Sequence, residues 1–224
     1  MTDHTDYPAL YRESRERIAA LVGTASDEQL GTTVPGCPAW SVADTVAHLS
    51  ALAVDAIGGR LSGVPGDDET AAQVRERRGM SIGAVLAEWE GAAAAVEQAL
   101  GARRMPLAIV HDVITHEADI RGALGSGRPP AAAWTASLDG LAHHLDRLGG
   151  HGTITVHAGE REFTAGSGDP VTTLDVDPYE FWRAALGRRS TAQMAGWNWS
   201  GDPAPYLKAI PVFGPTATDI TEEG

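Results

Sequence analysis

The sequence predicts an α+β protein, in which a helical bundle is followed by a small mixed α/β region. Up to residue 148, apolar residues recur with helical spacing in several segments that short, turn-rich links separate, as they do in an up-and-down bundle. After residue 149 the pattern changes to the polar and apolar alternation of strands. Hydrophobic residues make up 43% of the 224 residues, which is enough to build a sizeable core.

The first elements can be read in chain order. A helix is expected over residues 7–23, where apolar residues recur with helical spacing before a glycine. A loop is expected over residues 31–40, because the segment GTTVPGCPAW contains two prolines and two glycines. Ser41 and Asp44 then stand three residues apart like the two partners of a capping box. This pair predicts a helix over residues 42–57.

Four more helices complete the predicted bundle. Ser81 is placed to cap one of them, and Pro106 stands where a proline at the first helical position belongs. Paired or single glycines end most of these segments, as is typical of helix C-termini. The four expected ranges are 69–78, 82–100, 106–125 and 134–148.

The C-terminal part begins with three strand-like segments, GTITVHA, EREFTAG and VTTLDVD. After them, Asp177 supplies an N-cap, Pro178 the first helical position and Glu180 an early acidic residue. This combination predicts a helix that ends at Gly187. Residues 190–211 are expected to form two short helices.

The boundary between the two parts is expected where glycines and prolines interrupt the helical pattern. Two segments qualify, residues 126–133 and residues 149–152. We place the boundary after residue 148, which gives a helical bundle over residues 1–148 and a small α/β domain over residues 149–224.

Charge and composition exclude several classes of partner. A formal net charge of −13 repels phosphate backbones, so we expect no nucleic-acid partner. The single cysteine, Cys37, favours a reducing, cytoplasmic location. The first residues lack the basic and apolar regions of a signal peptide, and Glu88 and Glu90 interrupt the longest apolar run, so we expect no membrane segment. A small-molecule substrate is expected, with the chain a monomer or a homodimer.

The segment HDVITHEADIRGALG, residues 111–125, contains a candidate metal site. Asp112 and His116 lie one turn apart, so on a helix they point the same way beside its apolar arc. A carboxylate oxygen and an imidazole nitrogen in this arrangement can chelate one divalent ion, as in the metal sites of helical bundles. His48, in the middle of a predicted helix and beside its apolar stripe, is the best candidate for a third ligand.

A simpler interpretation stays open at this point. His48 could be an ordinary half-exposed helix histidine, and Asp112 and His116 could form a solvated polar flank, because D-x-x-x-H is a weak pattern by itself. Trp40 is expected to pack under its loop as an anchor. The sequence contains no GxSxG elbow, no HExxH motif, no CxxC pair and no glycine-rich phosphate loop.

Three blocks of the sequence resemble one family. The segment VPGCPAWSVADTVAHL, residues 34–49, resembles a signature of the DinB-like, mycothiol-dependent maleylpyruvate isomerase family of actinobacteria. The segment HDVITHEADIRGALG resembles the second signature of that family. The segments LGRRS and WSGDPAPYL, residues 186–190 and 199–207, resemble its C-terminal domain. The order and separation of the blocks match, and the resemblance covers residues 8 to 213.

The resemblance implies an N-terminal DinB-like four-helix bundle that holds a divalent metal, usually zinc, and a small, sterol-carrier-like C-terminal domain. By motif position, the metal ligands implied are His48, Asp112 and His116. Many members of the family carry glutamate where this chain has Asp112. Because aspartate is one methylene shorter, a metal here would lie nearer the helix or bind the carboxylate through water.

The resemblance also implies a chemistry. Mycothiol, a low-molecular-weight thiol, would be activated at the metal for cis–trans isomerisation or for S-transfer to a small electrophilic substrate. Arg121 and Arg188 are candidates for binding a substrate carboxylate, because a guanidinium group offers two parallel donors. Arg121 could instead form a structural ion pair with Asp119 or Glu117.

Two other functions stay open on the sequence alone. One is a metal-dependent biosynthetic enzyme that does not use mycothiol. The other is a non-catalytic metal-binding or stress protein, in which the bundle keeps a structural metal. Metal content would separate a metal-free module from both metal-dependent enzymes. Thiol-dependent turnover would separate the enzyme that uses mycothiol from the one that does not.

Overall fold

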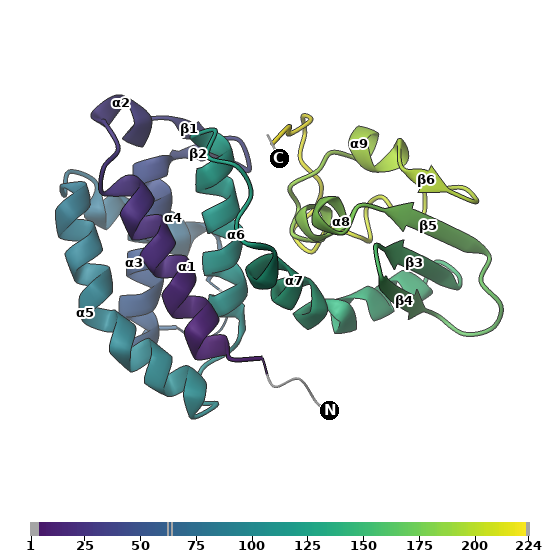
Figure 1. Cartoon of the computed structure of the whole chain (residues 1–224), viewed down its shortest axis with the longest axis horizontal. Helices are drawn as coiled ribbons and strands as arrows, with labels where there is room; N and C mark the ends of the chain where they lie inside the picture. The colour runs from purple at the N-terminus through teal and green to yellow at the C-terminus, as the bar shows by residue number, and fades with distance from the viewer. Residues whose placement is uncertain (1–4, 62, 64, 223–224) are drawn as a thin grey trace. The chain divides into compact units, whose positions relative to one another are not determined.

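The computed structural model describes residues 5–61, 63 and 65–222 (Figure 1). Contacts divide the chain into two compact units, Met1–Pro129 with Glu222–Gly224, and Pro130–Thr221. The first unit is a bundle of helices, and the second contains a four-stranded sheet. The predicted α+β class, with an N-terminal bundle and a small C-terminal α/β part, is therefore confirmed.

Four long helices form the bundle, and a shorter fifth helix packs against one of them (Figure 1). Their bounds are α1 Tyr7–Val22, α3 Val42–Ile57, α4 Asp67–Arg77, α5 Ile82–Gly101 and α6 Ala108–Ala123. Helices α1 and α3 each contact both α5 and α6, while α4 packs on α3. These ranges match the predicted helices closely, except that α6 begins slightly after Pro106.

Aliphatic side chains fill the centre of the bundle. The members with no exposed surface include Ile18, Val46, Val96, Ile114 and Ile120, which come from all four long helices. Burying one such side chain stabilises the folded state by about 1.5–3 kcal/mol relative to leaving that side chain in water. The bundle is therefore held together mainly by its apolar core, and the polar side chains inside it need partners of their own.

An aromatic pair ties α1 to α5 inside this core. The indole Nε1 of Trp89 donates a hydrogen bond to the hydroxyl of Tyr11 at 2.9 Å, and both side chains are buried. Burial, partly offset by this hydrogen bond, raises the pKa of Tyr11 to about 12, because the phenolate would be poorly solvated there.

The link between α1 and α3 is more ordered than the sequence predicts. Helix α2, Asp27–Leu30, begins after a capping box formed by Ser26 and Gln29. Strands β1, Thr33–Val34, and β2, Cys37–Ser41, then pair in antiparallel fashion. The expected loop over residues 31–40 is therefore a short hairpin, because Pro35 and Gly36 occupy the turn and the residues on both sides are extended.

The second unit is built on a sheet with the order β4-β3-β5-β6. Its strands are β3 Ile154–Ala158, β4 Arg161–Ala165, β5 Thr172–Val176 and β6 Asn198–Trp199. Strand β3 runs antiparallel to β4 and parallel to β5, and β6 pairs antiparallel with β5. The three predicted strands are therefore present, and β6 is an addition.

Helices cover this sheet. Helix α8, Pro178–Ala185, follows β5 and begins at the predicted N-cap Asp177, whose carboxylate accepts two backbone N–H groups. The ring of Phe181 in α8 stacks on that of Phe163 in β4, with 6.2 Å between centroids. Helix α7, Ala131–Gly140, contacts α8.

Two predicted elements of this unit differ from the structure. The segment 134–148 is not one helix, because α7 ends at Gly140 and a 3-10 helix, η1, spans Ala142–Gly149. Glycine has the lowest helix propensity after proline, which accounts for the break. In the segment 190–211, all of which the structure describes, α9 Thr191–Ala195 is the only helix. The rest of that segment consists of β6, bends and turns, and it contains three prolines, which cannot continue a helix.

The contacts divide the chain near Pro130, which falls in the first of the two segments where the sequence places a boundary. Helix α7 thus belongs with the second unit by its contacts. The domain boundary after residue 148 stays a prediction.

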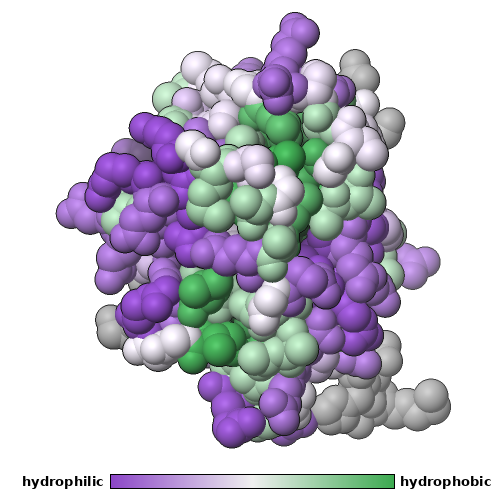
Figure 2. All heavy atoms as spheres, turned by 90° about the vertical axis from the view of Figure 1, so that its left-hand side faces the viewer, coloured by the Kyte–Doolittle hydropathy of each residue, from purple (hydrophilic) through white to green (hydrophobic). Residues whose placement is uncertain are grey.

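Figure 2 shows one face of the molecule, on which apolar residues form a band between hydrophilic margins. Exposed positions of the alanine-rich helix α5 include Ala84, Ala87 and Ala94, so this helix presents small side chains to solvent. Large apolar side chains exposed on the bundle unit include Ile57 and Met80, and isolated residues of this kind are normal on protein surfaces. Among the described residues, none of the helices combines the length and apolar character needed to cross a membrane.

Candidate metal centre

Helix α3 places His48 inside the bundle. The helix begins at the predicted capping box, in which Ser41 Oγ accepts the Asp44 backbone N–H and the Asp44 carboxylate accepts the Ser41 N–H. His48 follows one turn later and is only 3% exposed. A buried imidazole needs partners for both ring nitrogens, so its surroundings decide what it can do.

Helix α6 brings Asp112 and His116 to the same place. The Nε2 atom of His48 lies 3.4 Å from Asp112 Oδ2, and the Nε2 atom of His116 lies 3.6 Å from Asp112 Oδ1. One potential ligand atom from each of the three residues lies within 4.8 Å of the others. The three side chains predicted from the sequence therefore converge from two helices, with the carboxylate between the two imidazoles.

The far nitrogen of each imidazole faces an oxygen. His48 Nδ1 lies 3.0 Å from Gln73 Oε1, and His116 Nδ1 lies 2.9 Å from Asp119 Oδ2. Amide and carboxylate oxygens accept hydrogen bonds, so each contact fits an imidazole that carries its proton on Nδ1. A hydrogen bond of this kind on the outer nitrogen is the usual support of a metal-binding histidine, because it fixes the tautomer and the ring orientation.

Two residues of β2 border the three side chains. The half-buried indole of Trp40 lies with its ring centroid 4.9 Å from that of His48 and 6.1 Å from that of His116. The thiol of Cys37 forms a hydrogen bond with His116. Trp40, expected to pack under a loop, instead lies in β2 as a half-buried neighbour of both imidazoles.

The electrostatics of the centre favour positive charge. Burial lowers the pKa of His116, but the charge of Asp112 and the hydrogen bonds with Asp119 and Cys37 outweigh it and raise the pKa to about 10. A site that holds a proton so firmly also attracts a cation, and a metal ion must displace that proton to bind.

The donor set fits a divalent cation. Two imidazole nitrogens and one carboxylate oxygen are the ligand types that zinc prefers, and three protein ligands are what a catalytic zinc site provides. The two Nδ1 hydrogen bonds supply the supporting contacts that such a site needs. Whether the three residues bind a metal stays a prediction.

Comparison with known proteins decides the family. The family described as mycothiol maleylpyruvate isomerase N-terminal domain matches residues 11–147, which is more than half of the chain. The chain belongs to this family. The family assignment made from the sequence blocks is therefore confirmed, and the matched range includes α3 and α6, which carry the three converging side chains.

Solved structures support the fold of this family member. A crystal structure of the mycothiol-dependent maleylpyruvate isomerase matches with a TM-score of 0.59 and 14% identity. A histidine-to-alanine mutant of the mycothiol-dependent maleylpyruvate isomerase matches with a TM-score of 0.58 and 13% identity. Both matches cover 87% of this chain and 91% of the other. At such low identity the likeness shows the fold alone. No curated protein matches the chain.

The two arginines predicted to bind substrate lie in different surroundings. Arg121, in the maleylpyruvate isomerase N-terminal domain, donates to Glu117 Oε1 at 3.0 Å and to the Ser126 carbonyl at 3.2 Å. This is the structural ion pair that the alternative interpretation describes. Arg188 lies in the second unit, is 8% exposed and donates to the Leu186 carbonyl at 2.7 Å. A role for either residue in binding substrate stays a prediction.

Sequence reasoning missed Gln73 and the contact of Cys37 with His116. It named Asp119 only as a partner for Arg121, although its spacing three residues after His116 could have indicated a contact on the same helix face. Gln73 gives no comparable signal, because α4 has few apolar residues to show which face it turns inward.

Proposed function

We propose that this chain is an enzyme that binds a divalent metal, zinc above all, through His48, Asp112 and His116, and that it uses the metal to activate a low-molecular-weight thiol. The observation that supports this proposal is the convergence of two imidazole Nε2 atoms on one carboxylate, with both Nδ1 atoms engaged elsewhere. Membership of the mycothiol maleylpyruvate isomerase family supports mycothiol as the thiol.

The reaction proposed is cis–trans isomerisation or S-transfer on a small electrophilic substrate. A bound divalent metal supplies a positive charge that lowers the pKa of a thiol and so favours the nucleophilic thiolate at neutral pH. The residues of the chain orient the donors and limit access of water. Trp40 contributes an aromatic surface beside both imidazoles, on which an apolar part of a ligand can rest.

Substrate binding is assigned to arginines in this proposal. Arg121 and Arg188 are the two candidates, since a guanidinium group binds a carboxylate with two parallel hydrogen bonds. Arg121 already donates to Glu117 and to the Ser126 carbonyl, so it would have to share or exchange these partners to reach a substrate. Lysine at either position would keep the charge but lose the paired geometry.

The test begins with metal content. Native mass spectrometry of the purified protein should show one bound divalent metal, and His48→Ala should lose it while circular dichroism shows unchanged helicity. The matched control is His111→Ala, which removes a half-buried histidine from α6. If His48→Ala keeps full metal occupancy, the assignment of the ligands is wrong.

Turnover then separates the possible chemistries. A panel of small electrophiles should be converted only when mycothiol and metal are both present. Conversion without any thiol would instead indicate a metal-dependent enzyme that does not use mycothiol. A protein that binds metal but converts no member of the panel, with or without thiol, would support a non-catalytic role.

A further inference from the structure

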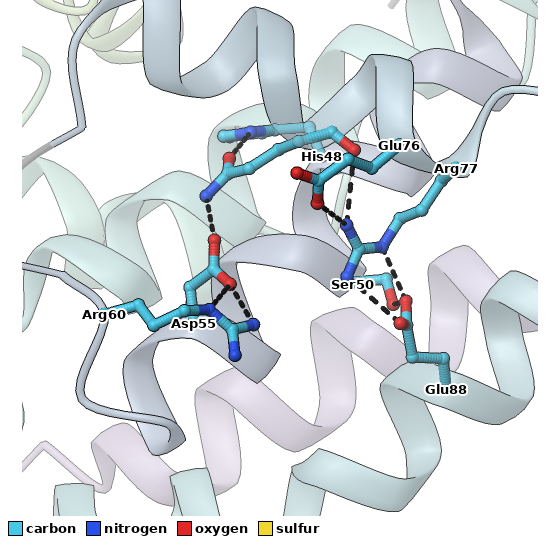
Figure 3. Close-up of polar contacts among 8 residues, drawn as sticks. His48, Ser50, Asp55, Arg60, Glu76, Arg77 and Glu88 are labelled. Carbon is cyan, nitrogen blue, oxygen red and sulfur yellow. Dashed lines mark hydrogen bonds and ion pairs between the residues drawn. The ribbon is translucent and has the colours of Figure 1, made fainter.

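A chain of hydrogen bonds extends from His48 to the far end of α3. The Nδ1 atom of His48 contacts Gln73 Oε1 at 3.0 Å, and Gln73 Nε2 donates to Asp55 Oδ2 at 2.7 Å. The other oxygen of Asp55 accepts a hydrogen bond from Arg60 Nε at 2.7 Å. Figure 3 shows His48, Asp55 and Arg60 along this chain. Gln73 itself is only 5% exposed, so water does not compete freely for its amide.

The direction of this chain is fixed at its outer end. A carboxylate paired with an arginine accepts hydrogen bonds and does not donate them. Asp55 therefore requires the NH₂ group of Gln73 to face it, and the amide oxygen of Gln73 must then face His48. An amide oxygen can only accept, so His48 must carry its proton on Nδ1. The hydrogen bonds that begin at the ion pair of Asp55 and Arg60 thus fit only the Nδ1 tautomer of His48.

These hydrogen bonds oppose the effect of a second acceptor beside His48. Asp112 Oδ2 lies 3.4 Å from His48 Nε2 and would accept a proton from that nitrogen if His48 were the other tautomer. In that tautomer Nε2 carries the proton, so it has no lone pair to offer a metal ion. Holding the proton on Nδ1 keeps the lone pair on the side that faces Asp112 and His116.

Helix α4 is anchored so that Gln73 stays in reach of His48. One turn after Gln73, Arg77 donates from Nε and Nη2 to the two carboxylate oxygens of Glu88, at 2.6 and 3.0 Å. Ser50 in α3 donates to the same carboxylate at 2.6 Å. Figure 3 shows Arg77, Glu88 and Ser50 meeting at this point. These contacts connect α3, α4 and α5 and limit the movement of α4 along α3.

We propose that Gln73, oriented by Asp55 and Arg60, is a positioning residue that sets the tautomer of His48 and keeps its Nε2 lone pair available to a metal ion. This inference rests on the proposed function for its purpose, but the tautomer is a property of the metal-free protein. The two ideas can therefore be tested separately.

The first experiment reads the tautomer directly. Long-range ¹⁵N–¹H correlation spectra of the metal-free full chain, recorded at a pH where His48 is neutral, should show the proton on Nδ1. In Gln73→Met the population with the proton on Nε2 should rise, because the acceptor at Nδ1 is lost while Asp112 remains beside Nε2. Arg75→Met is the matched control, since Arg75 lies on the same helix and is exposed; it should leave the tautomer unchanged.

A second variant tests the orienting step without removing Gln73. In Asp55→Asn the partner of the Gln73 amide can donate as well as accept, so the amide is free to turn and both tautomers of His48 should be populated. The proposal is overturned if His48 carries its proton on Nε2 in the unmodified chain. It is also overturned if Gln73→Met and Asp55→Asn, both folded by circular dichroism, leave the proton on Nδ1.

The third measurement is zinc affinity by calorimetry at fixed pH. Gln73→Met should weaken zinc binding by about 10- to 100-fold, as loss of a supporting contact of a metal ligand typically does, while Arg75→Met should leave it unchanged. Equal affinities in these two variants would overturn the role of Gln73. Failure of the unmodified chain to bind zinc would reject the proposed function and leave the tautomer result standing.

Discussion

Glu117 accepts hydrogen bonds from both Nε and Nη2 of Arg17, at 2.7 and 2.8 Å. The carboxylate is only 1% exposed, so this paired contact ties α6 to α1 inside the bundle. Glu117 directly follows His116 in the sequence and lies on another face of the same helix. The position of α6, and with it of both its candidate ligands, therefore depends partly on this ion pair.

Glu117→Gln should lower the free energy of unfolding by about 3 kcal/mol, because it removes the buried carboxylate that both Arg17 and Arg121 share. Chemical denaturation would measure this loss. Glu13→Gln is the matched control, since Glu13 also pairs with Arg17 but at 3.8 Å and with a 57% exposed side chain. It should cost less than about 0.5 kcal/mol. Equal losses would show that burial of Glu117 adds nothing.

Asp119→Asn should weaken zinc binding by about tenfold or more. The amide oxygen of asparagine can still accept from His116 Nδ1, so the ring orientation is kept while the charge is lost. A carboxylate partner raises the basicity of a metal-binding imidazole, and this contribution disappears in the variant. Calorimetric titration would measure the change, with Asp139→Asn, in an exposed ion pair with Arg161, as control. Unchanged affinity would mean that orientation alone matters.

The protein should lose stability in alkali partly through Tyr11. In the unfolded chain this phenol ionises near its ordinary pKa of 10.0, whereas burial holds its proton to about pH 12 in the folded state. Between pH 10 and pH 12 only the unfolded chain releases the proton. The contribution of Tyr11 to the free energy of unfolding is therefore complete below pH 10 and falls as the pH rises. The difference in unfolding free energy between the unmodified chain and Tyr11→Phe should be flat below pH 10 and then decrease. A difference that stays constant up to pH 12 would contradict this assignment.

Gly187→Ala should destabilise the second unit by more than the cost of placing an alanine at a positive φ. Gly187 has a φ of +78°, and a Cβ there would lie 2.6 Å from the Gly214 carbonyl oxygen. Gly168 has a φ of +94°, and a Cβ there would have nothing within 4 Å, so Gly168→Ala isolates the backbone cost of about 1 kcal/mol. Thermal unfolding should show the larger decrease for Gly187→Ala; equal decreases would mean that the close approach is relieved without cost.

Much of the bundle could be predicted because its signals are local. Ser41 and Asp44 form the capping box that their spacing indicates, and α3 begins where that box places it. Asp112 and His116 share a face because a helix has 3.6 residues per turn, which the spacing alone reveals. The convergence of His48 with this pair follows from packing of α3 against α6; the place of His48 beside the apolar stripe of its helix made it a candidate, and the family resemblance then selected it.

Other features depend on contacts between elements and leave little trace in the sequence. The segment of β1 and β2 predicts a loop because its prolines and glycines are turn signals, and the strands beside them are very short. Gln73 lies on a polar helix without an apolar stripe, so nothing in its own segment shows that it turns toward His48. The ion pair of Glu117 with Arg17 joins residues far apart in the chain, and charge alone does not select one partner among many.

The hairpin that carries Trp40 and Cys37 has two short strands, and such a hairpin is marginal in water unless other elements support it. Here it rests on α3 and α6, the two helices that carry the candidate ligands. A ligand that binds between the imidazoles and against Trp40 binds more tightly when the hairpin is folded. By linkage, the bound ligand stabilises the folded hairpin by the same free energy. Backbone amides of β1 and β2 should therefore exchange with solvent more slowly when the centre is filled, making the hairpin a reporter of occupancy.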